Sequence, residues 1–116
     1  MSETYYVKTF GGLEITNDNV TVNIVELFGK QLVNLLQVLL FHSEKPVQKD
    51  ELIDILWPES KNPSSALKFS IFRLRSELNE IDFFKDKEVI VTTRKGYILN
   101  PNLDWNIDFV EIQKGL

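Results

Sequence analysis

Aromatic and β-branched residues alternate with polar ones in the first part of the chain, a pattern typical of short strands. Such residues run from Tyr5 to Phe10 and meet the conformationally permissive pair Gly11-Gly12 before Leu13-Glu14-Ile15. A second polar turn, Asn17-Asp18-Asn19, precedes an alternating stretch from Val20 to Ile24. The pattern predicts an antiparallel meander of about three strands.

Two amphipathic helices are predicted to follow. From Lys30 to Phe41 the apolar positions recur at steps of three and four, which places one stripe of leucines on a helix: Leu32, Leu35, Leu36, Leu39 and Leu40. Pro46 ends this segment. The stretch from Gln48 to Leu56 has the same periodicity over a shorter length, and Pro58 stops it. Both helices are expected to turn their apolar faces to the core.

A third helix has a clear start signal and two unlike faces. Asn62 is suited to cap the free amides and Pro63 to the first helical position, so we predict about 16 helical residues through Leu78. The packed face holds Leu67, Ile71, Leu74 and Leu78. The opposite face holds Ser65, Phe69, Phe72, Arg73 and Ser76, while the packed face is flanked by Lys68 and Arg75. Two outward phenylalanines among basic side chains indicate a contact surface.

A hairpin with a basic tip is predicted after this helix. A polar and aromatic connection runs from Asn79 to Lys87, and the β-branched stretch from Val89 to Thr93 is typical of a strand. The returning strand is Tyr97 to Leu99, and the tip between the two strands consists of Arg94, Lys95 and Gly96. The hairpin therefore carries two adjacent cations at its exposed end.

The order of these elements, three helices and then a two-stranded hairpin, is the layout of a winged helix-turn-helix. We predict an α+β fold in one structural domain: an N-terminal antiparallel β-meander (residues 1–26), a three-helix core with its hairpin wing (27–100) and a C-terminal tail (101–116). The tail is too apolar for a disordered linker, so we expect it to dock or to begin a further element; its large apolar residues are Trp105, Ile107, Phe109, Val110 and Ile112.

Composition removes several classes of chemistry. The chain has 116 residues, of which 43% are apolar, and this suits one small domain with an ordinary core. It has no cysteine and a single histidine, His42, so we expect no disulfide, no metal site, no cofactor and no enzymatic activity. His42 falls at the end of a predicted helix, where an imidazole meets unsatisfied carbonyls. The sequence has no secretory signal and no membrane span, which favours a cytoplasmic location.

The formal net charge of −4 argues, as a total, against a nucleic-acid partner, but the charges are unevenly distributed. Residues 1–60 hold four basic and nine acidic side chains, whereas residues 61–97 hold eight basic and five acidic ones. Residues 98–116 hold one basic and three acidic side chains. The third helix and the hairpin therefore form a basic segment between two acidic ones, as phosphate contacts require.

Three strings in this order resemble a known family: ELIDILWPES, ALKFSIFRLRSEL and VTTRKGYIL. They are similar to the DNA-binding domain of OmpR/PhoB-type response regulators and, more closely, of SARP-type bacterial transcriptional activators. The resemblance covers about residues 5–112 and depends most on the Leu-Trp-Pro, Arg-Leu-Arg and Gly-Tyr elements. The tail string LDWNIDFVE also resembles the exit toward a helical-repeat effector domain in SARP-type regulators, which indicates a fragment or a short form.

The resemblance implies a domain that binds promoter DNA, as tandem or dimeric copies on direct repeats, with RNA polymerase as a further partner. On the recognition helix the matching positions facing DNA are Ser65, Lys68, Phe69, Phe72 and Arg73, with Arg75 on phosphate. In the wing the matching positions are Arg94 and Lys95. No membrane partner is implied.

Phe72 departs from this pattern, because the outward site it occupies is commonly polar or basic in such proteins. Phe69 and Phe72 could then read thymine methyl groups or pack on a partner subunit. The acidic total and this phenylalanine pair also support an alternative function, a winged-helix domain that has become a protein-interaction module. The main prediction is sequence-specific binding of double-stranded DNA, with the third helix in the major groove and the wing on the backbone or minor groove.

Overall fold

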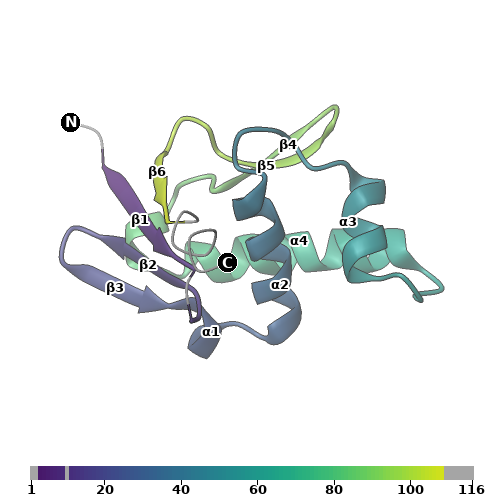
Figure 1. Ribbon diagram of the computed structural model, residues 1–116, viewed down its shortest axis with the longest axis horizontal. Helices are drawn as coiled ribbons and strands as arrows, with labels where there is room; N and C mark the ends of the chain where they lie inside the picture. Colours follow the sequence, from purple (N-terminus) through teal and green to yellow (C-terminus); the bar gives the residue numbers. More distant parts are fainter. Residues whose placement is uncertain (1–2, 10, 109–116) are drawn as a thin grey trace.

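The computed structural model describes residues 3–9 and 11–108. Figure 1 shows a small sheet beside a group of helices, with a hairpin packed against them. In chain order the elements are β1 (Thr4–Lys8), β2 (Glu14–Asn17), β3 (Val20–Asn23), α1 (Ile24–Leu27), α2 (Lys30–Phe41), α3 (Lys49–Leu56), α4 (Pro63–Asn79), the 3-10 helix η1 (Asp82–Phe84), β4 (Ile90–Thr93), β5 (Gly96–Leu99) and β6 (Asp104–Ile107). This is the predicted α+β winged-helix architecture.

The N-terminal sheet has four strands in the order β3-β2-β1-β6. Antiparallel pairing of β1 with β2 and of β2 with β3 confirms the predicted meander. The fourth strand, β6, comes from the segment predicted as a tail and pairs parallel with β1, in a register from Thr4 opposite Asp104 to Val7 opposite Ile107. The expectation that this tail docks is thus confirmed through Ile107. Phe10, Phe109, Val110 and Ile112 lie outside the described residues.

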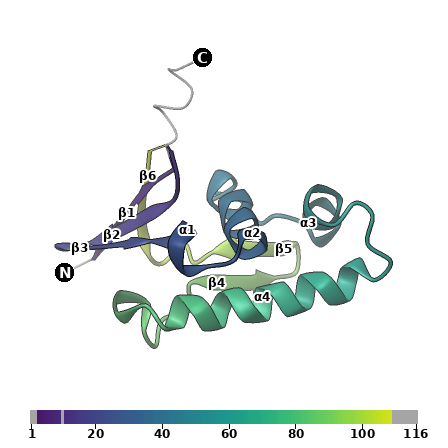
Figure 2. The same ribbon diagram turned by 90° about the horizontal axis from the view of Figure 1, so that it is seen from below.

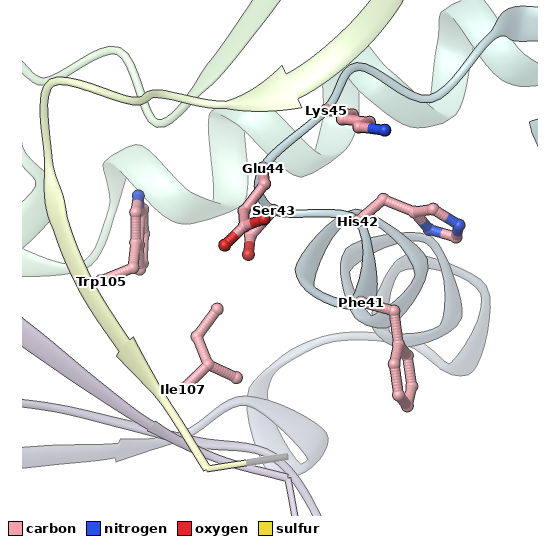
Figure 3. A pocket seen from close by; sticks show the side chains of 7 residues that line it. All are labelled: Phe41, His42, Ser43, Glu44, Lys45, Trp105 and Ile107. Atoms are coloured by element: carbon pink, nitrogen blue, oxygen red, sulfur yellow. The ribbon is translucent and has the colours of Figure 1, made fainter. Parts of the chain in front are cut away.

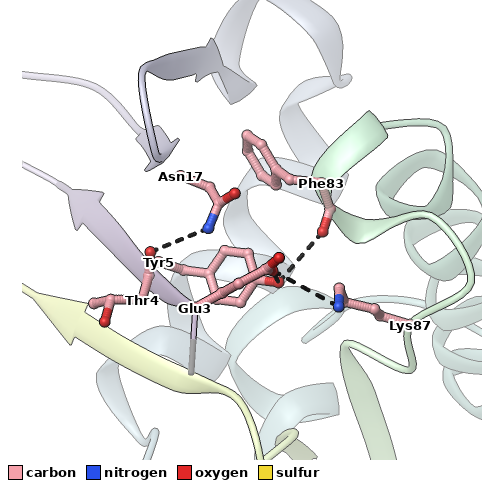
Figure 4. Close-up of polar contacts among 6 residues, drawn as sticks. All are labelled: Glu3, Thr4, Tyr5, Asn17, Phe83 and Lys87. Atoms are coloured by element: carbon pink, nitrogen blue, oxygen red, sulfur yellow. Dashed lines mark hydrogen bonds and ion pairs between the residues drawn. The ribbon is translucent and has the colours of Figure 1, made fainter. Parts of the chain in front are cut away.

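An aromatic cluster joins the sheet to the connection that follows α4. The ring of Tyr5 lies 4.9 Å from that of Phe84 and 5.4 Å from that of Trp105, measured between centroids. The Tyr5 hydroxyl donates to a carboxylate oxygen of Glu3 at 2.8 Å (Figure 4). Burial, together with that carboxylate, raises the pKa of Tyr5 to about 12. The connection predicted only as polar and aromatic therefore supplies part of the core.

The three predicted helices are α2, α3 and α4, and each contributes side chains without exposed surface to one core, among them Leu35, Leu52 and Leu74. Figure 2 shows α4 running beneath α2, α3 and the hairpin, with the four-stranded sheet at one end. Pro63 occupies the first turn of α4 as predicted, but the Asn62 side chain makes no capping hydrogen bond. Asn62 is the N-cap residue, as predicted, and its backbone carbonyl accepts the first intrahelical hydrogen bond from the Ala66 amide at 3.1 Å. Only the expected side-chain contribution to the cap is wrong.

The short helix α1 has no counterpart among the predicted elements. The Asn23 side chain caps it by accepting a hydrogen bond from the Glu26 amide at 3.3 Å. Four residues are too few for apolar periodicity to register, and the strand pattern of β3 runs directly into it. The helix turns the chain from the sheet into α2.

We call β4, β5 and the Arg94-Lys95 turn between them the wing. The outer edge of β5 is joined to the connection before α3 by two backbone hydrogen bonds. The Val47 amide donates to the Tyr97 carbonyl at 2.8 Å, and the Val47 carbonyl accepts from the Tyr97 amide at 3.0 Å. Gly96 makes this approach possible, because its φ is +146° and a Cβ there would lie 1.9 Å from the Val47 carbonyl oxygen. The wing is thereby held beside the start of α3.

Candidate nucleic-acid interface

The two faces of α4 are separated as the sequence predicts. Leu67, Ile71, Leu74 and Leu78 are at most 2% exposed, and they hold the helix against the core. On the outer face the predicted contact residues Ser65, Lys68, Phe69, Phe72 and Arg73 are all exposed. Phe69 and Phe72 expose 62% and 66% of their surface, which is unusual for two phenylalanines within one helical turn. This face is not covered by any described residue and is free to meet a partner.

Arg73 lies on the exposed face of α4 and contacts two neighbours on the same helix. Its guanidinium carbon is 5.9 Å from the centroid of the Phe69 ring, within the range of a cation–π contact. One guanidinium nitrogen lies 3.8 Å from a carboxylate oxygen of Glu77, one turn further along. About half of the Arg73 side chain stays exposed, so the planar fork keeps donors for a base edge or a phosphate.

The tip of the wing presents Arg94 and Lys95 to solvent on a tightly hydrogen-bonded turn. The Thr93 hydroxyl oxygen accepts from the amides of Lys95 and Gly96 at 3.1 and 3.2 Å. The same hydroxyl donates to the Gly96 carbonyl at 3.1 Å. Such a turn fixes the backbone while leaving both cationic side chains able to reach a phosphate.

Lys49 is a third cation at the same place, and sequence reasoning did not assign it a function. It is the first residue of α3 and lines a hollow of about 460 Å³ together with Asp50, Arg94 and Lys95. Its ammonium nitrogen lies 6.0 Å from the centroid of the Tyr97 ring, on β5. Periodicity shows only that Lys49 faces outward; the bridge between Val47 and Tyr97, which brings α3 and the wing together, has no local sequence signal.

Arg75 occupies a different position from the other predicted contact residues. It is half-buried on the flank of α4, and its guanidinium donates to β4 instead of projecting outward. The Ile90 carbonyl accepts from Nε at 3.3 Å and from Nη2 at 3.1 Å, and the Thr92 hydroxyl accepts from Nη2 at 2.7 Å. Arg75 thus connects the predicted recognition helix to the wing.

A second hollow, of about 440 Å³, lies between the end of α2 and β6 (Figure 3). Trp105 and Ile107 line it from β6, while His42 points away from β6. The Nδ1 atom of His42 is 3.0 Å from the Val38 carbonyl oxygen, as its position at the helix end predicts, and Nε2 is 3.8 Å from a carboxylate oxygen of Glu51.

Among residues 3–9 and 11–108, no group of three or more histidine, cysteine or acidic side chains is arranged to hold a metal ion. None of the described helices has the length and hydropathy of a membrane span.

Comparison with known proteins agrees with this geometry. Residues 18–99 match the family model described as "Transcriptional regulatory protein, C terminal". A search of curated proteins gives no match. Among solved structures, the DNA-binding domain of Escherichia coli CadC is 28% identical with a TM-score of 0.57, over 74% of this chain and 77% of that one.

A second structure shares the fold. It is Mycobacterium tuberculosis EmbR in complex with a low-affinity phosphopeptide, which is 24% identical with a TM-score of 0.62, over 84% of this chain and 25% of that one. This chain therefore corresponds to about a quarter of the EmbR chain. The family match covers more than half of the sequence and includes every helix and strand from β3 to β5. The chain belongs to the family of C-terminal domains of transcriptional regulatory proteins, and it is a winged-helix DNA-binding domain of a bacterial transcriptional regulator, a family without enzymatic activity.

Proposed function

We propose that this domain binds double-stranded DNA at specific sequences, with α4 in the major groove and the wing on the adjacent backbone or minor groove. The observation that supports this most is the exposed face of α4, where Arg73 stands opposite the buried leucines. A major groove admits one helix, and an arginine fork can donate two hydrogen bonds to a guanine edge. Ser65, Lys68, Phe69 and Phe72 surround Arg73 on this face.

In this proposal both α4 and the wing supply cations that contact phosphates. Lys68 lies on α4, and Arg94 and Lys95 lie on the wing, where Lys49 adds a further positive charge. These cations neutralise phosphates and fix the register of α4 without reading sequence. The local basic character outweighs the net charge of −4, because screening limits the reach of distant acidic groups to about 10 Å at ordinary salt.

Selection from a pool of random duplexes, followed by affinity measurements across a salt series, tests this proposal. We expect one enriched sequence, and we expect Arg73→Ala to weaken binding to it by about 5- to 150-fold, the value of one base contact. Lys68→Ala should weaken all duplexes alike and reduce the salt slope by about one contact. Lys30→Ala, an exposed cation at the start of α2, is the matched control and should change little. Selection without an enriched sequence, or full binding by Arg73→Ala, would contradict the proposal.

A second candidate function is supported by the phenylalanine pair. Phe69 and Phe72 could pack on another protein or on a second copy of this chain instead of on thymine methyl groups. Sedimentation of wild type and of Phe69→Ser separates the two functions. Association that Phe69→Ser abolishes, in a protein that binds no duplex, would favour the interaction module.

Tandem binding on direct repeats, with RNA polymerase as a later partner, is the arrangement we propose from the family resemblance. Footprints on the selected DNA test the first part, because two copies in tandem protect two half-sites in the same orientation. A single protected half-site at saturating protein would contradict it.

A further inference from the structure

Arg75 is a predicted DNA contact whose guanidinium already donates hydrogen bonds to strand β4 within the protein. Its Nε and Nη2 atoms donate to the Ile90 carbonyl at 3.3 and 3.1 Å, and Nη2 also donates to the Thr92 hydroxyl at 2.7 Å. The planar guanidinium can satisfy two acceptors on one strand in a fixed geometry, which a lysine ammonium cannot do in the same way. The guanidinium of Arg75, the group that would donate to a phosphate, is therefore already hydrogen-bonded to β4.

The hydrogen bonds of Arg75 attach the wing to α4 through strand β4. The wing is a sheet of only two strands, so β4 and β5 each have one outer edge. The edge of β5 is joined to Val47 by two backbone hydrogen bonds. Arg75 binds β4, so the two strands are attached to the rest of the domain by different contacts, one of which comes from α4 itself.

We propose that Arg75 is a positioning residue that fixes the wing relative to α4, so that Arg73 and the cations of the wing tip reach one duplex together. This proposal rests on the proposed function. Two linked contacts reinforce each other only when their separation matches the spacing of their targets, since the second contact is then made at a high effective concentration. A wing free to shift would lose that advantage and would be ordered at the moment of binding.

Two substitutions at Arg75 separate positioning from direct phosphate contact. Arg75→Lys keeps the charge but loses the planar fork, and Arg75→Met removes the charge and keeps a long apolar side chain. We expect both variants to weaken binding to the selected duplex to a similar extent, about tenfold. A direct phosphate contact predicts instead that Arg75→Lys binds nearly as wild type while Arg75→Met does not, and this result would overturn the proposal.

A double-mutant cycle with the wing tip adds a readout that a general structural role would not move. If Arg75 acts through the wing, Arg75→Met should cause no further loss in a protein that already carries Arg94→Ala and Lys95→Ala. Additive losses would overturn the proposal. Thr92→Val, which removes only the hydroxyl acceptor, should give a smaller loss of the same kind, and it keeps the test available if Arg75→Met fails to fold.

A measurement without DNA distinguishes failure of this proposal from failure of the proposed function. The chain has no cysteine, so nitroxide labels can be placed at Glu80→Cys, after the end of α4, and at Lys95→Cys on the wing tip. Double electron–electron resonance should show a broader distance distribution with Arg75→Lys than with the wild-type arginine. An unchanged distribution would overturn the positioning role whether or not the domain binds a duplex, and a broader one in a protein that binds no duplex would contradict only the proposed function.

Discussion

Arg73 is shared between a partner outside the protein and a partner within it. Glu77 lies one helical turn away at 3.8 Å, and this exposed pair stabilises the helix by about 0.3–0.5 kcal/mol. The same carboxylate carries a negative charge near the surface that we propose faces phosphates. Glu77 thus favours the ordered helix and opposes the approach of DNA.

We predict that Glu77→Gln strengthens binding to the selected duplex by about two- to fivefold, because it frees Arg73 and removes a repulsive charge. The free energy of unfolding should fall by about 0.3–0.5 kcal/mol, since the ion pair is lost. Fluorescence anisotropy with labelled duplex and chemical denaturation measure the two effects.

Glu80→Gln removes the same charge just beyond the end of α4 and serves as the control. Its effect on affinity should be smaller, because Arg73 keeps its Glu77 partner. The gain from Glu77→Gln should also shrink in an Arg73→Ala background. Equal effects of the two glutamate substitutions would mean that only net charge matters.

Among the elements, the wing depends most on contacts between distant parts of the chain. Its tip is ordered by Thr93, its β5 edge by Val47 and its β4 strand by Arg75. Only the first of these contacts is local in sequence. A hairpin of two four-residue strands is marginal by itself, so its position depends on the other two.

We predict that Gly96→Ala lowers the free energy of unfolding by about 3 kcal/mol, since an added Cβ both meets the Val47 carbonyl and occupies a strained φ. Thermal unfolding followed by circular dichroism measures the change. Gly29→Ala is the matched control, because no atom lies within 4 Å of a Cβ at that position. A Gly96→Ala protein as stable as the control would show that the wing can leave Val47 at little cost.

The elements that the sequence predicts correctly are those whose signals are local. Periodic leucines determine α2 and α4, Pro63 marks the start of α4, and the basic turn marks the wing. The parallel pairing of β6 with β1 could not be predicted, because it joins residues about a hundred positions apart. Lys49 was missed for the same reason, since only the folded chain brings it beside the wing tip. The spacing of Arg75 places it beside the packed face of α4, but no sequence pattern shows that its guanidinium donates to Ile90 and Thr92.

At the scale of the whole molecule, the described chain closes on itself through the sheet. Strand β6 returns to β1 and carries Trp105 into the aromatic cluster with Tyr5 and Phe84. The indole nitrogen of Trp105 also donates to the Asn100 carbonyl at 3.1 Å, which ties β6 to the end of the wing. The segments predicted as residues 1–26 and 101–116 lie at opposite ends of the sequence, but they contribute strands to the same sheet.

We predict that Trp105→Ala lowers the free energy of unfolding by about 3 kcal/mol, near the lower limit for large aromatic truncations because Trp105 is only half-buried. The affinity for the selected duplex should stay within about twofold at temperatures where the variant is folded, since the sheet lies at one end of α4. Denaturant unfolding and anisotropy measure the two quantities. Asn106→Ala, exposed on the same strand, is the control, and equal stability of the two variants would contradict the role of the cluster.

The parallel pairing of the first and last described strands also determines how the domain responds to force. In the register from Thr4 opposite Asp104 to Val7 opposite Ile107, tension applied at the start of β1 and at the end of β6 loads the ladder along its length. The bonds between these two strands must then fail together in shear and cannot open one at a time. The edge of the sheet that completes the fold is therefore also a mechanical clamp, which protects the helices from a pull on the ends of the chain.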